Sequence, residues 1–316
     1  MVDGAGHESA WVSAHAFFQS DLDLLVKQVV APLVDEFAAR RMASDFFFLR
    51  YWEGGPHLRL RVRPAAGVSP VDVRRVIAAR FGQYLSRNPS AERMSAAQYE
   101  AVAPQLALRE QMRSWTAALY PNNSVSFIAY RREHERYGHG ASIQAVERHF
   151  VESSRIALRV VTLAAPAERR ATLALACILV AWFVGHSDRG SITMWPATSY
   201  RKGAEYLGTV QIGELARTVE LARTARHLAE GGPAARAEGV LTRWTRSMTD
   251  LRAALSAAEA AEPGSGGNVG PVLDLCAHLV CNRLGISVLT EAALRNLAAQ
   301  AVDSLHTERS RPDGLA

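Results

Sequence analysis

The amino-acid sequence predicts an α+β protein, with antiparallel β elements in the N-terminal half packed with a mostly helical C-terminal half. Segments with the apolar and polar alternation typical of strands lie in the first 140 residues. Beyond residue 141 the sequence becomes rich in Ala, Leu and Arg, with helical periodicity. Strands and helices segregated in this way indicate α+β rather than a parallel sheet of alternating strands and helices.

The first half is expected to hold four strands and two helices. The expected strands span residues 11–18, 46–52, 57–63 and 124–130. The segment 53–56, Glu-Gly-Gly-Pro, is a hairpin-like connection between the second and third strands. One helix is predicted to start at Asp21. Another is predicted over residues 69–85, because Ser69 is followed by Pro at the first helical position and a carboxylate at the third.

Helices are predicted throughout the second half. They span residues 142–163, 167–184, 203–230, 234–261, 271–284 and 291–304. One flexible linker rich in Gly, at about 262–270, separates two of these helices. No internal repeat is present. We therefore expect one domain over residues 1–316, with a β-rich part over about 8–140 and a helical part over about 141–305.

The composition excludes several classes of protein. The chain has 316 residues, 48% of them hydrophobic, enough for a sizeable core. Its longest apolar run, residues 173–184, is shorter than the roughly 20 residues that cross a bilayer, and its polar start predicts no signal peptide. The three cysteines (Cys177, Cys276 and Cys281) argue by their odd number against a disulfide framework. We expect a cytoplasmic protein that does not contact a membrane.

The charge of the chain is mildly basic. The net charge is +5, from 36 Lys and Arg against 31 Asp and Glu, and Lys occurs only as Lys27 and Lys202. A GC-rich genome produces such an excess of Arg. No run of basic residues and no known nucleic-acid motif accompanies the charge, so direct nucleic-acid binding is not expected. An acidic ligand or peptide stays open.

The strand at 57–63 (His-Leu-Arg-Leu-Arg-Val-Arg) is the most informative segment. Because alternate side chains point to opposite faces, its three apolar residues are expected on one face. The other face is expected to carry His57, Arg59, Arg61 and Arg63. A half-buried strand explains the alternation. No acid alternates with the arginines, however, and guanidinium groups repel one another unless anions are near, so this face favours carboxylate or phosphate recognition. Arg50 on the preceding strand is a candidate fourth guanidinium.

The predicted helix at 271–284 carries a polar stripe. Asp274, His278 and Asn282 follow one another at intervals of four residues, so they share one side of the helix. A lone helical histidine is more often structural than catalytic, and the spacing alone leaves both interpretations open. Asp274 is placed one turn before the ring, where a carboxylate fixes one tautomer. That arrangement suits a histidine that transfers protons.

Other catalytic arrangements are not indicated. Cys276, His278 and Cys281 are close in sequence, but no second ligand pair follows at zinc spacing, so no metal site is expected. The sequence contains no nucleophile elbow, phosphate loop or dinucleotide fingerprint, and no cofactor is expected. The segment 186–188, His-Ser-Asp, is interpreted as a turn at a helix end without a catalytic role.

Three blocks of sequence resemble the thiopeptide-type bacteriocin biosynthesis domain, which is similar to the C-terminal elimination domain of class I lantibiotic dehydratases. The blocks are residues 50–61 (Arg-Tyr-Trp-Glu-Gly-Gly-Pro-His-Leu-Arg-Leu-Arg), 130–138 (Tyr-Arg-Arg-Glu-His-Glu-Arg-Tyr-Gly) and 278–284 (His-Leu-Val-Cys-Asn-Arg-Leu). They follow the family's order and cover most of the chain. Members commonly have two glycines after the Arg-Tyr pair, whereas this chain has Gly138-His139-Gly140, so this turn is expected to differ.

The resemblance implies a lyase. In the family's reaction, glutamate is eliminated from a glutamylated serine or threonine of a ribosomal precursor peptide, which leaves dehydroalanine or dehydrobutyrine. The matching positions imply catalytic roles for Arg59, Arg61, Arg132 and His278. They imply peptide-binding roles for Arg50, Tyr51, His57, Arg136 and Asn282. The catalytic arginines are expected to stabilise an enolate and hold the leaving carboxylate, and His278 is expected to transfer a proton.

The resemblance also implies partners and leaves other functions open. The expected partners are the leader and core of the precursor peptide and a separate tRNA-dependent glutamylating enzyme. A homodimer is compatible with the sequence. One alternative is a cyclase that joins two dehydroalanines by a formal 4+2 cycloaddition, forms the central pyridine of a thiopeptide and releases the leader peptide. The other is an inactive subunit that binds the peptide as a scaffold.

Overall fold

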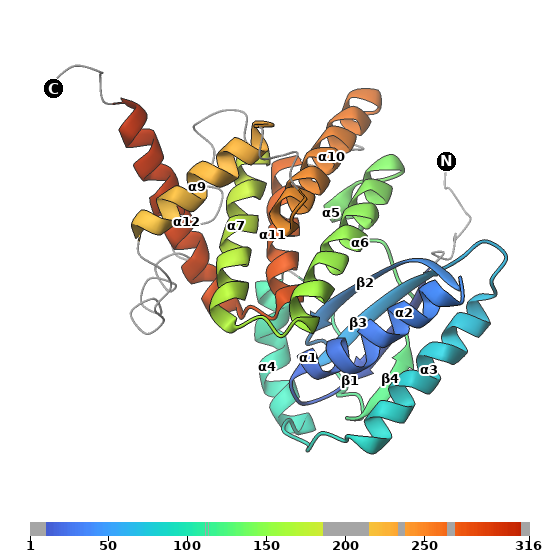
Figure 1. Ribbon diagram of the computed structural model, residues 1–316. Coiled ribbons are helices and arrows are strands. Elements are labelled where there is room, and N and C mark those ends of the chain that lie inside the picture. Colours follow the sequence, from blue (N-terminus) through green and yellow to red (C-terminus); the bar gives the residue numbers. More distant parts are fainter. Residues whose placement is uncertain are drawn as a thin grey trace. The chain divides into compact units, whose positions relative to one another are not determined.

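The computed structural model describes residues 11–110, 112, 114–185, 215–232, 238–263 and 269–310. The chain divides into two compact units, Met1–Arg132 and Glu133–Ala316. In its described part, the first unit holds a sheet with helices and the second unit is helical (Figure 1). The predicted α+β class, with its strands in the N-terminal half, is confirmed.

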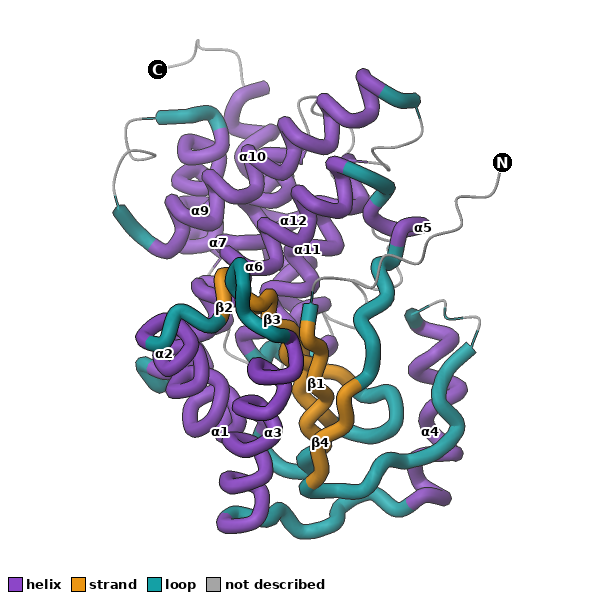
Figure 2. The backbone as a smooth tube through the Cα atoms, turned by 90° about the vertical axis from the view of Figure 1, so that its right-hand side faces the viewer, coloured by secondary structure: helices purple, strands orange, loops and turns teal. Residues whose placement is uncertain are grey.

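Four strands form the sheet of the first unit. They are β1 (Val12–Phe17), β2 (Ala43–Tyr51), β3 (His57–Pro64) and β4 (Ser124–Phe127). Their order is β2-β3-β1-β4, and each neighbouring pair is antiparallel (Figure 2). Each agrees with a predicted strand, although β2 begins at residue 43 rather than 46 and β4 ends at 127 rather than 130. The strand rich in arginine, β3, is therefore an inner strand.

Helices cover the apolar face of this sheet (Figure 1). They are α1 (Leu22–Leu25), the π-helical turn η1 (Val26–Val30), α2 (Ala31–Ala39) and α3 (Pro70–Arg87). Leu58, Leu60 and Val62 of β3 lie on this face and are at most 1% exposed. Burial of such side chains is worth about 1.5–3 kcal/mol each, so this layer stabilises the unit and fixes which face of β3 is polar.

The two predicted helix starts of the first unit are confirmed. The side chain of Asp21 accepts a hydrogen bond from the Asp23 N–H at the start of α1. The π turn lies just before Pro32, which has no N–H to donate within the helix. At the start of α3, the Ser69 side chain accepts from the Val71 N–H, and Pro70 occupies the first turn as expected.

A helix that the sequence analysis did not predict, α4 (Ala96–Arg109), follows α3. It begins with a capping box, in which Ser95 and Gln98 each accept a hydrogen bond from the other's backbone N–H. Most of its side chains are exposed and Pro104 lies inside it, so its apolar periodicity is weak. The spacing of Ser95 and Gln98 is the signal that would have located its start.

The second unit consists, where the structure describes it, of helices and their connections. They are α5 (His134–Tyr137), α6 (Ala141–Thr162), α7 (Ala167–Gly185), α9 (Leu215–Ala229), α10 (Val240–Ala261), α11 (Val269–Leu284) and α12 (Val288–Ser310). α7 packs against α9, α10, α11 and α12, and its residues 174–182 are all buried. The longest apolar run of the sequence is thus the central helix of this core.

Each predicted helix agrees with an observed helix of the second unit, although α12 spans Val288–Ser310 rather than 291–304 and α10 begins at Val240 rather than before residue 238. Residues 203–214 of one predicted helix and 234–237 of another lie outside the described residues. The same holds for residues 264–268 of the predicted linker and for the turn at 186–188.

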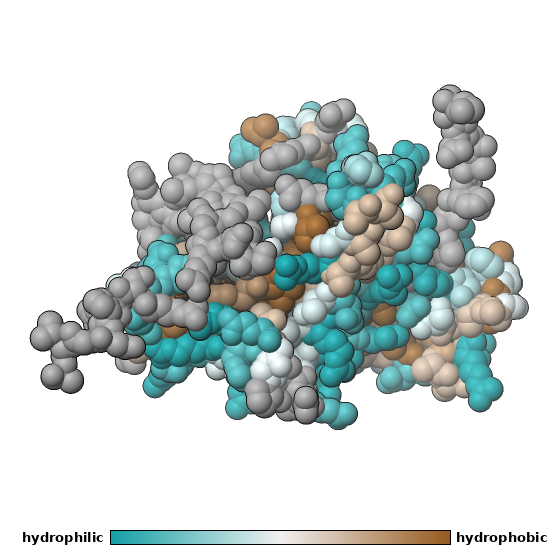
Figure 3. Space-filling view, turned by 90° about the horizontal axis from the view of Figure 1, so that it is seen from above, coloured by the Kyte–Doolittle hydropathy of each residue, from teal (hydrophilic) through white to brown (hydrophobic). Residues whose placement is uncertain are grey.

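The surface of the described residues is a mosaic. On the face shown in Figure 3, hydrophilic residues surround smaller hydrophobic areas. No helix in the described part of the chain is long and apolar enough to cross a membrane. Several large apolar side chains, among them Phe47, Phe48 and Trp244, are fully buried within their units, whereas Trp115 is 38% exposed.

Candidate functional site: an arginine face and a clamped histidine

The predicted polar face of β3 is present in the first unit. In the antiparallel register, Arg59 lies opposite His15 of β1 and Leu49 of β2, and Arg61 lies opposite Phe47. Directly opposed residues share a face of the sheet, so the basic side chains of β3 lie among aromatic and imidazole rings. Their face is the one opposite Leu58, Leu60 and Val62, as the alternation predicts.

The prediction that Arg50 adds a fourth guanidinium to this face is wrong. Arg50 lies opposite Leu58 in the register, on the helix-covered face, and it therefore does not join Arg59 and Arg61. Its Nη2 atom binds Oδ1 of Asp23 in α1 at 2.6 Å, and both side chains are largely buried. The face of Arg50 depends on how β2 pairs with β3, which the sequence of either strand alone does not contain.

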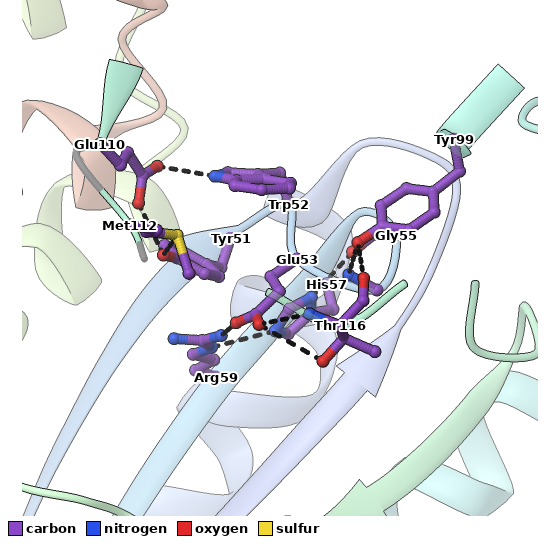
Figure 4. Close-up of polar contacts among 11 residues, drawn as sticks. Tyr51, Trp52, Glu53, Gly55, His57, Arg59, Tyr99, Glu110, Met112 and Thr116 are labelled. Atoms are coloured by element: carbon purple, nitrogen blue, oxygen red, sulfur yellow. Dashed lines mark hydrogen bonds and ion pairs between the residues drawn. The ribbon is translucent and has the colours of Figure 1, made fainter. Parts of the chain in front are cut away.

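Arg59 is held by three neighbours (Figure 4). Its Nη2 atom donates to Oε2 of Glu53 at 2.9 Å, and its Nε atom donates to Nε2 of His57 at 3.1 Å. Its guanidinium carbon lies 3.6 Å from the centre of the Tyr51 ring. An ion pair, a hydrogen bond and a cation–π contact together fix the plane of the guanidinium group.

The histidines beside Arg59 are neutral. Arg59 has only donors, so Nε2 of His57 accepts, and Nδ1 carries the hydrogen donated to the Gly55 carbonyl at 2.8 Å. Burial, followed by the charge of Arg59, lowers the pKa of His57 to about 3. His15 stacks on His57 with ring centres 4.9 Å apart, and burial, followed by Arg59, lowers its pKa to about 2. The positive charge at this point therefore belongs to the arginines.

Glu53, the counter-ion of Arg59, is fixed in the β2–β3 turn. Its Oε1 atom accepts from the N–H of Thr116 at 3.0 Å and from the Thr116 hydroxyl at 3.3 Å. Tyr99 links the same segments, because its hydroxyl accepts from the Gly54 N–H and donates to the Thr116 carbonyl. Gly54 has a φ of +78°, and a Cβ atom there would lie 2.7 Å from the Tyr120 ring. Gly54 therefore allows the tight turn that positions Glu53.

Tyr51 is held at its other end by Glu110. The Tyr51 hydroxyl donates to Oε2 of Glu110 at 2.6 Å, and Trp52 Nε1 donates to Oε1 at 2.6 Å (Figure 4). Burial, followed by the Glu110 carboxylate, raises the pKa of Tyr51. The phenol stays protonated, and its ring serves as the platform under Arg59. Glu53 and Glu110 were not singled out from the sequence, because their roles depend on contacts across the fold.

The remaining arginines of β3 lie against aromatic rings. The guanidinium carbon of Arg61 lies 4.4 Å from the centre of the Tyr130 ring and 5.2 Å from that of Phe47, and the residue is 8% exposed. Arg63 lies 4.3 Å from the Trp11 ring and 3.7 Å from Asp45. A row of arginines on one face of a strand requires anions nearby. The structure supplies part of that charge internally, from Glu53 beside Arg59 and from Asp45 beside Arg63.

The second sequence block spans the junction of the two units in the chain. Arg132, half-buried, is the last residue of the first unit, and the exposed Arg136 of α5 pairs with Glu133 at 3.4 Å in the second. In the turn that departs from the family pattern, Gly138 and Gly140 have φ angles of +77° and +50°. Both glycines take conformations that glycine adopts without a steric penalty, with His139 between them.

His278, the predicted catalytic histidine, lies on α11 in the second unit. Its Nδ1 atom is 2.8 Å from Oε2 of Glu291 on α12, and its side chain is 33% exposed. The Glu291 side chain is 5% exposed, and its Oε1 atom accepts from Nε of Arg295 at 2.8 Å. Glu291 thus holds the imidazole at one nitrogen while one third of the side chain reaches the surface.

Glu291 takes the orienting role that the sequence analysis gave to Asp274. Oδ1 of Asp274 instead accepts from Arg295 Nη1 at 2.6 Å and from Trp182 Nε1 at 3.0 Å. Arg295 is 2% exposed and bridges the two carboxylates. Burial by itself lowers its pKa, but Glu291 and Asp274 outweigh burial and raise it. The clamp of the imidazole is therefore a buried charged triad that joins α11 to α12.

The third sequence block also contains structural residues. Asn282 lies one turn after His278 on α11 and is half-buried, as the stripe predicts. Arg283 is fully buried and donates to the hydroxyls of Ser154 and Ser153 on α6, each at 3.1 Å. Within the described residues, no group of three His, Cys, Asp or Glu side chains is placed to hold a metal ion.

The predicted site residues form one group in each unit. His57, Arg59, Arg61 and Tyr51 are together in the first, and His278 and Asn282 are together in the second. Arg50 is on the other face of the sheet.

Comparison with known proteins identifies the family. The model of the lantibiotic biosynthesis dehydratase C-terminal family matches residues 11–302. No curated protein matches the chain in sequence. The pyridine synthase TbtD from thiomuracin biosynthesis has a similar structure, with a TM-score of 0.70 and 19% identity over 94% of this chain and 99% of TbtD.

Two further solved structures share the fold. The tRNA-dependent lantibiotic dehydratase MibB from Microbispora sp. 107891 has a TM-score of 0.55 and 20% identity. The match covers 98% of this chain but 29% of MibB. TsrL has a TM-score of 0.57 and 15% identity, over 94% of this chain and 95% of TsrL. The family match extends over both units, so the resemblance carried by the three sequence blocks is confirmed: this chain belongs to the lantibiotic biosynthesis dehydratase C-terminal family.

Proposed function

We propose that this protein is a lyase that eliminates glutamate from glutamylated serine or threonine residues of a ribosomal precursor peptide. The single observation that carries the proposal is the clamped imidazole of His278, which is held by a buried carboxylate and yet reaches the surface. Proton transfer at carbon needs a base that is fixed in orientation and accessible to the substrate. Family membership supports a peptide as the substrate.

The chemistry assigns a task to each group. In the elimination, a base takes the Cα proton, the electrons of that bond form the Cα=Cβ double bond, and the Cβ–O bond breaks to release glutamate. We assign the proton transfer to His278. We assign recognition of the glutamate carboxylates and of the developing enolate to Arg59, Arg61 and Arg132, since guanidinium groups bind such oxygens with paired hydrogen bonds.

Replacement of His278 by Asn tests the proton transfer. Asn keeps a polar side chain of similar reach but does not titrate, so we expect elimination to fall by about 10²–10⁴-fold. Glutamylated peptide should accumulate, and mass spectrometry measures it. The matched control is His227→Asn, because His227 is an exposed histidine on α9 of the same unit. Full dehydration by the His278→Asn variant would sink the assignment.

A second variant separates the arginine face from the histidine. Arg61→Met removes the charge and keeps much of the side-chain volume against the Tyr130 and Phe47 rings. We expect it to lose elimination with an unchanged unfolding midpoint in urea. A variant that is folded and fully active would remove Arg61 from the mechanism.

The second candidate function is pyridine formation. The observation that favours it is the similarity to the pyridine synthase TbtD over 99% of that chain. Such an enzyme would join two dehydroalanines by a formal 4+2 cycloaddition and release the leader peptide. Incubation with a glutamylated peptide and, separately, with a dehydrated peptide distinguishes the candidates: glutamate release identifies the lyase, and a cyclised product with loss of the leader identifies the cyclase. Binding without conversion of either peptide would indicate a scaffold subunit.

The proposal includes partners and a compartment. Elimination requires a separate tRNA-dependent enzyme that glutamylates the peptide first, and both reactions are assigned to the cytoplasm. A homodimer is the proposed assembly, and sedimentation of the purified protein tests it.

A further inference from the structure

The helices α6 and α10 are neighbours in the second unit (Figure 1). A groove of about 400 Å³ lies between them. α6 contributes Arg148, His149 and Glu152, and α10 contributes Arg243, Arg246 and Asp250. These residues recur at intervals of three and four along both helices, so each helix presents one stripe to the groove.

Some of the charged side chains along this groove form ion pairs and others do not. Arg243 binds Glu152 with both Nε and Nη2, at 2.7 and 2.6 Å, so these two charges balance each other. Arg148 and Arg246 are exposed and form no ion pair with any residue that the structure describes. Asp250 is also exposed and likewise forms no ion pair with a described residue. The groove thus offers two cations and one anion to a ligand.

His149, which is buried at the groove, has one ring nitrogen without a hydrogen-bond partner in the described structure. His149 is 2% exposed, and its Nδ1 atom is 2.8 Å from the Ser247 hydroxyl. Its Nε2 atom is buried without a hydrogen-bond partner in the described structure. Burial lowers the pKa of His149 to about 3, so the ring is neutral. A buried polar atom without a partner is costly, and a ligand atom that reached it would remove that cost.

We propose that the groove between α6 and α10 is a second peptide site, which binds an acidic side chain of the substrate peptide outside the reacting residue. The proposal rests on the proposed function for the nature of the substrate. Arg148 and Arg246 bind the carboxylate, and Asp250 binds backbone N–H groups of the same segment. The stripe from residue 145 to 152 is about 10 Å long, which is enough for about three extended residues.

The acidic residues of the groove favour a peptide over RNA. A nucleic acid would bring a phosphate at every step, and Asp250, the anion of the groove that Arg243 does not balance, would repel that chain. A peptide alternates acceptors with N–H donors, so it matches a groove that carries both signs of charge.

The test is binding of a labelled acidic peptide to the full-length protein, without any chemical step. The probe is a fluorescein-labelled 12-residue peptide of Glu and Ala, compared with the same peptide in Gln and Ala. Fluorescence anisotropy should show tighter binding of the Glu peptide. The double variant Arg148→Gln/Arg246→Gln should weaken it by about tenfold. The control Arg159→Gln/Arg217→Gln removes the same charge from exposed positions of α6 and α9 and should leave the affinity within about twofold.

Three outcomes would overturn the proposal. They are equal loss of binding in the two double variants, no preference for the Glu peptide, or tighter binding of an RNA oligonucleotide of the same length through the same arginines.

Kinetics with a glutamylated peptide then separate this site from the reaction. The Arg148→Gln/Arg246→Gln variant should raise KM about tenfold with kcat unchanged. A protein that binds the Glu peptide but eliminates nothing would refute the proposed function and leave the groove supported.

Discussion

At the scale of single residues, buried histidines decide how the first unit responds to acid. His15 and His57 have pKa values of about 2 and 3 in the fold, against an ordinary value of 6.5. Above pH 6.5 both are neutral whether folded or unfolded, so they add no pH dependence. Below pH 6.5 the unfolded chain binds protons that the folded chain refuses, so stability is lost as the pH falls from 6.5 toward 3.

Replacement of His15 by Phe tests this dependence. Phe keeps an aromatic ring beside His57 but does not titrate, so its variant should lose less stability on acidification. Between pH 6 and pH 5, each such histidine contributes a slope of about 1.0–1.3 kcal/mol per pH unit. Urea unfolding at several pH values measures the slope for both proteins. Equal slopes would show that His15 titrates normally in the fold.

The sequence predicted some of the positions of single side chains and not others. The alternation in β3 predicted the faces of His57, Arg59 and Arg61, because a strand has a period of two wherever it pairs. The prediction that Arg50 shares this face was wrong, because the face of Arg50 relative to β3 depends on the register between the two strands. Glu53 could not be recognised as the partner of Arg59, since the turn between them determines the distance.

At the scale of elements, the contact between α11 and α12 depends on Arg295. This buried arginine binds both Asp274 and Glu291, which carry negative charge into the same interior. Arg295→Met would leave two carboxylates without their cation, so we expect a loss of about 3–5 kcal/mol in the free energy of unfolding. Arg295→Lys, which keeps the charge but loses the fork of donors, should fall between that variant and the wild type.

Urea unfolding of the three proteins measures this ranking. A loss below about 1 kcal/mol for Arg295→Met would mean that the carboxylates find other partners or become protonated. The sequence located α11 and α12 but could not pair them through this triad. Helical periodicity shows which side of a helix is apolar, and not which neighbour covers its polar stripe.

At the scale of the whole molecule, the charge balance argues against nucleic-acid binding. The chain carries 36 basic and 31 acidic side chains, and several of the described arginines bind carboxylates of the same chain. We expect tRNA to bind more weakly than about 10 µM at physiological salt. Anisotropy of labelled tRNA, with the salt dependence, measures this. Submicromolar binding that survives physiological salt would contradict the expectation and would call for a basic surface outside the described residues.

The burial of the three cysteines has a consequence for the proposed formation of dehydroamino acids. Dehydroalanine is a Michael acceptor, and a thiolate that reached it would add to its β-carbon and trap the enzyme as a thioether. Cys177, Cys276 and Cys281 are fully buried. Burial raises the pKa of each thiol, to about 12 for Cys276, so the nucleophilic thiolate is scarce as well as inaccessible. If the protein is the proposed lyase, its intact mass should therefore stay unchanged after many turnovers, because no thiol of these cysteines is available to be alkylated by the product.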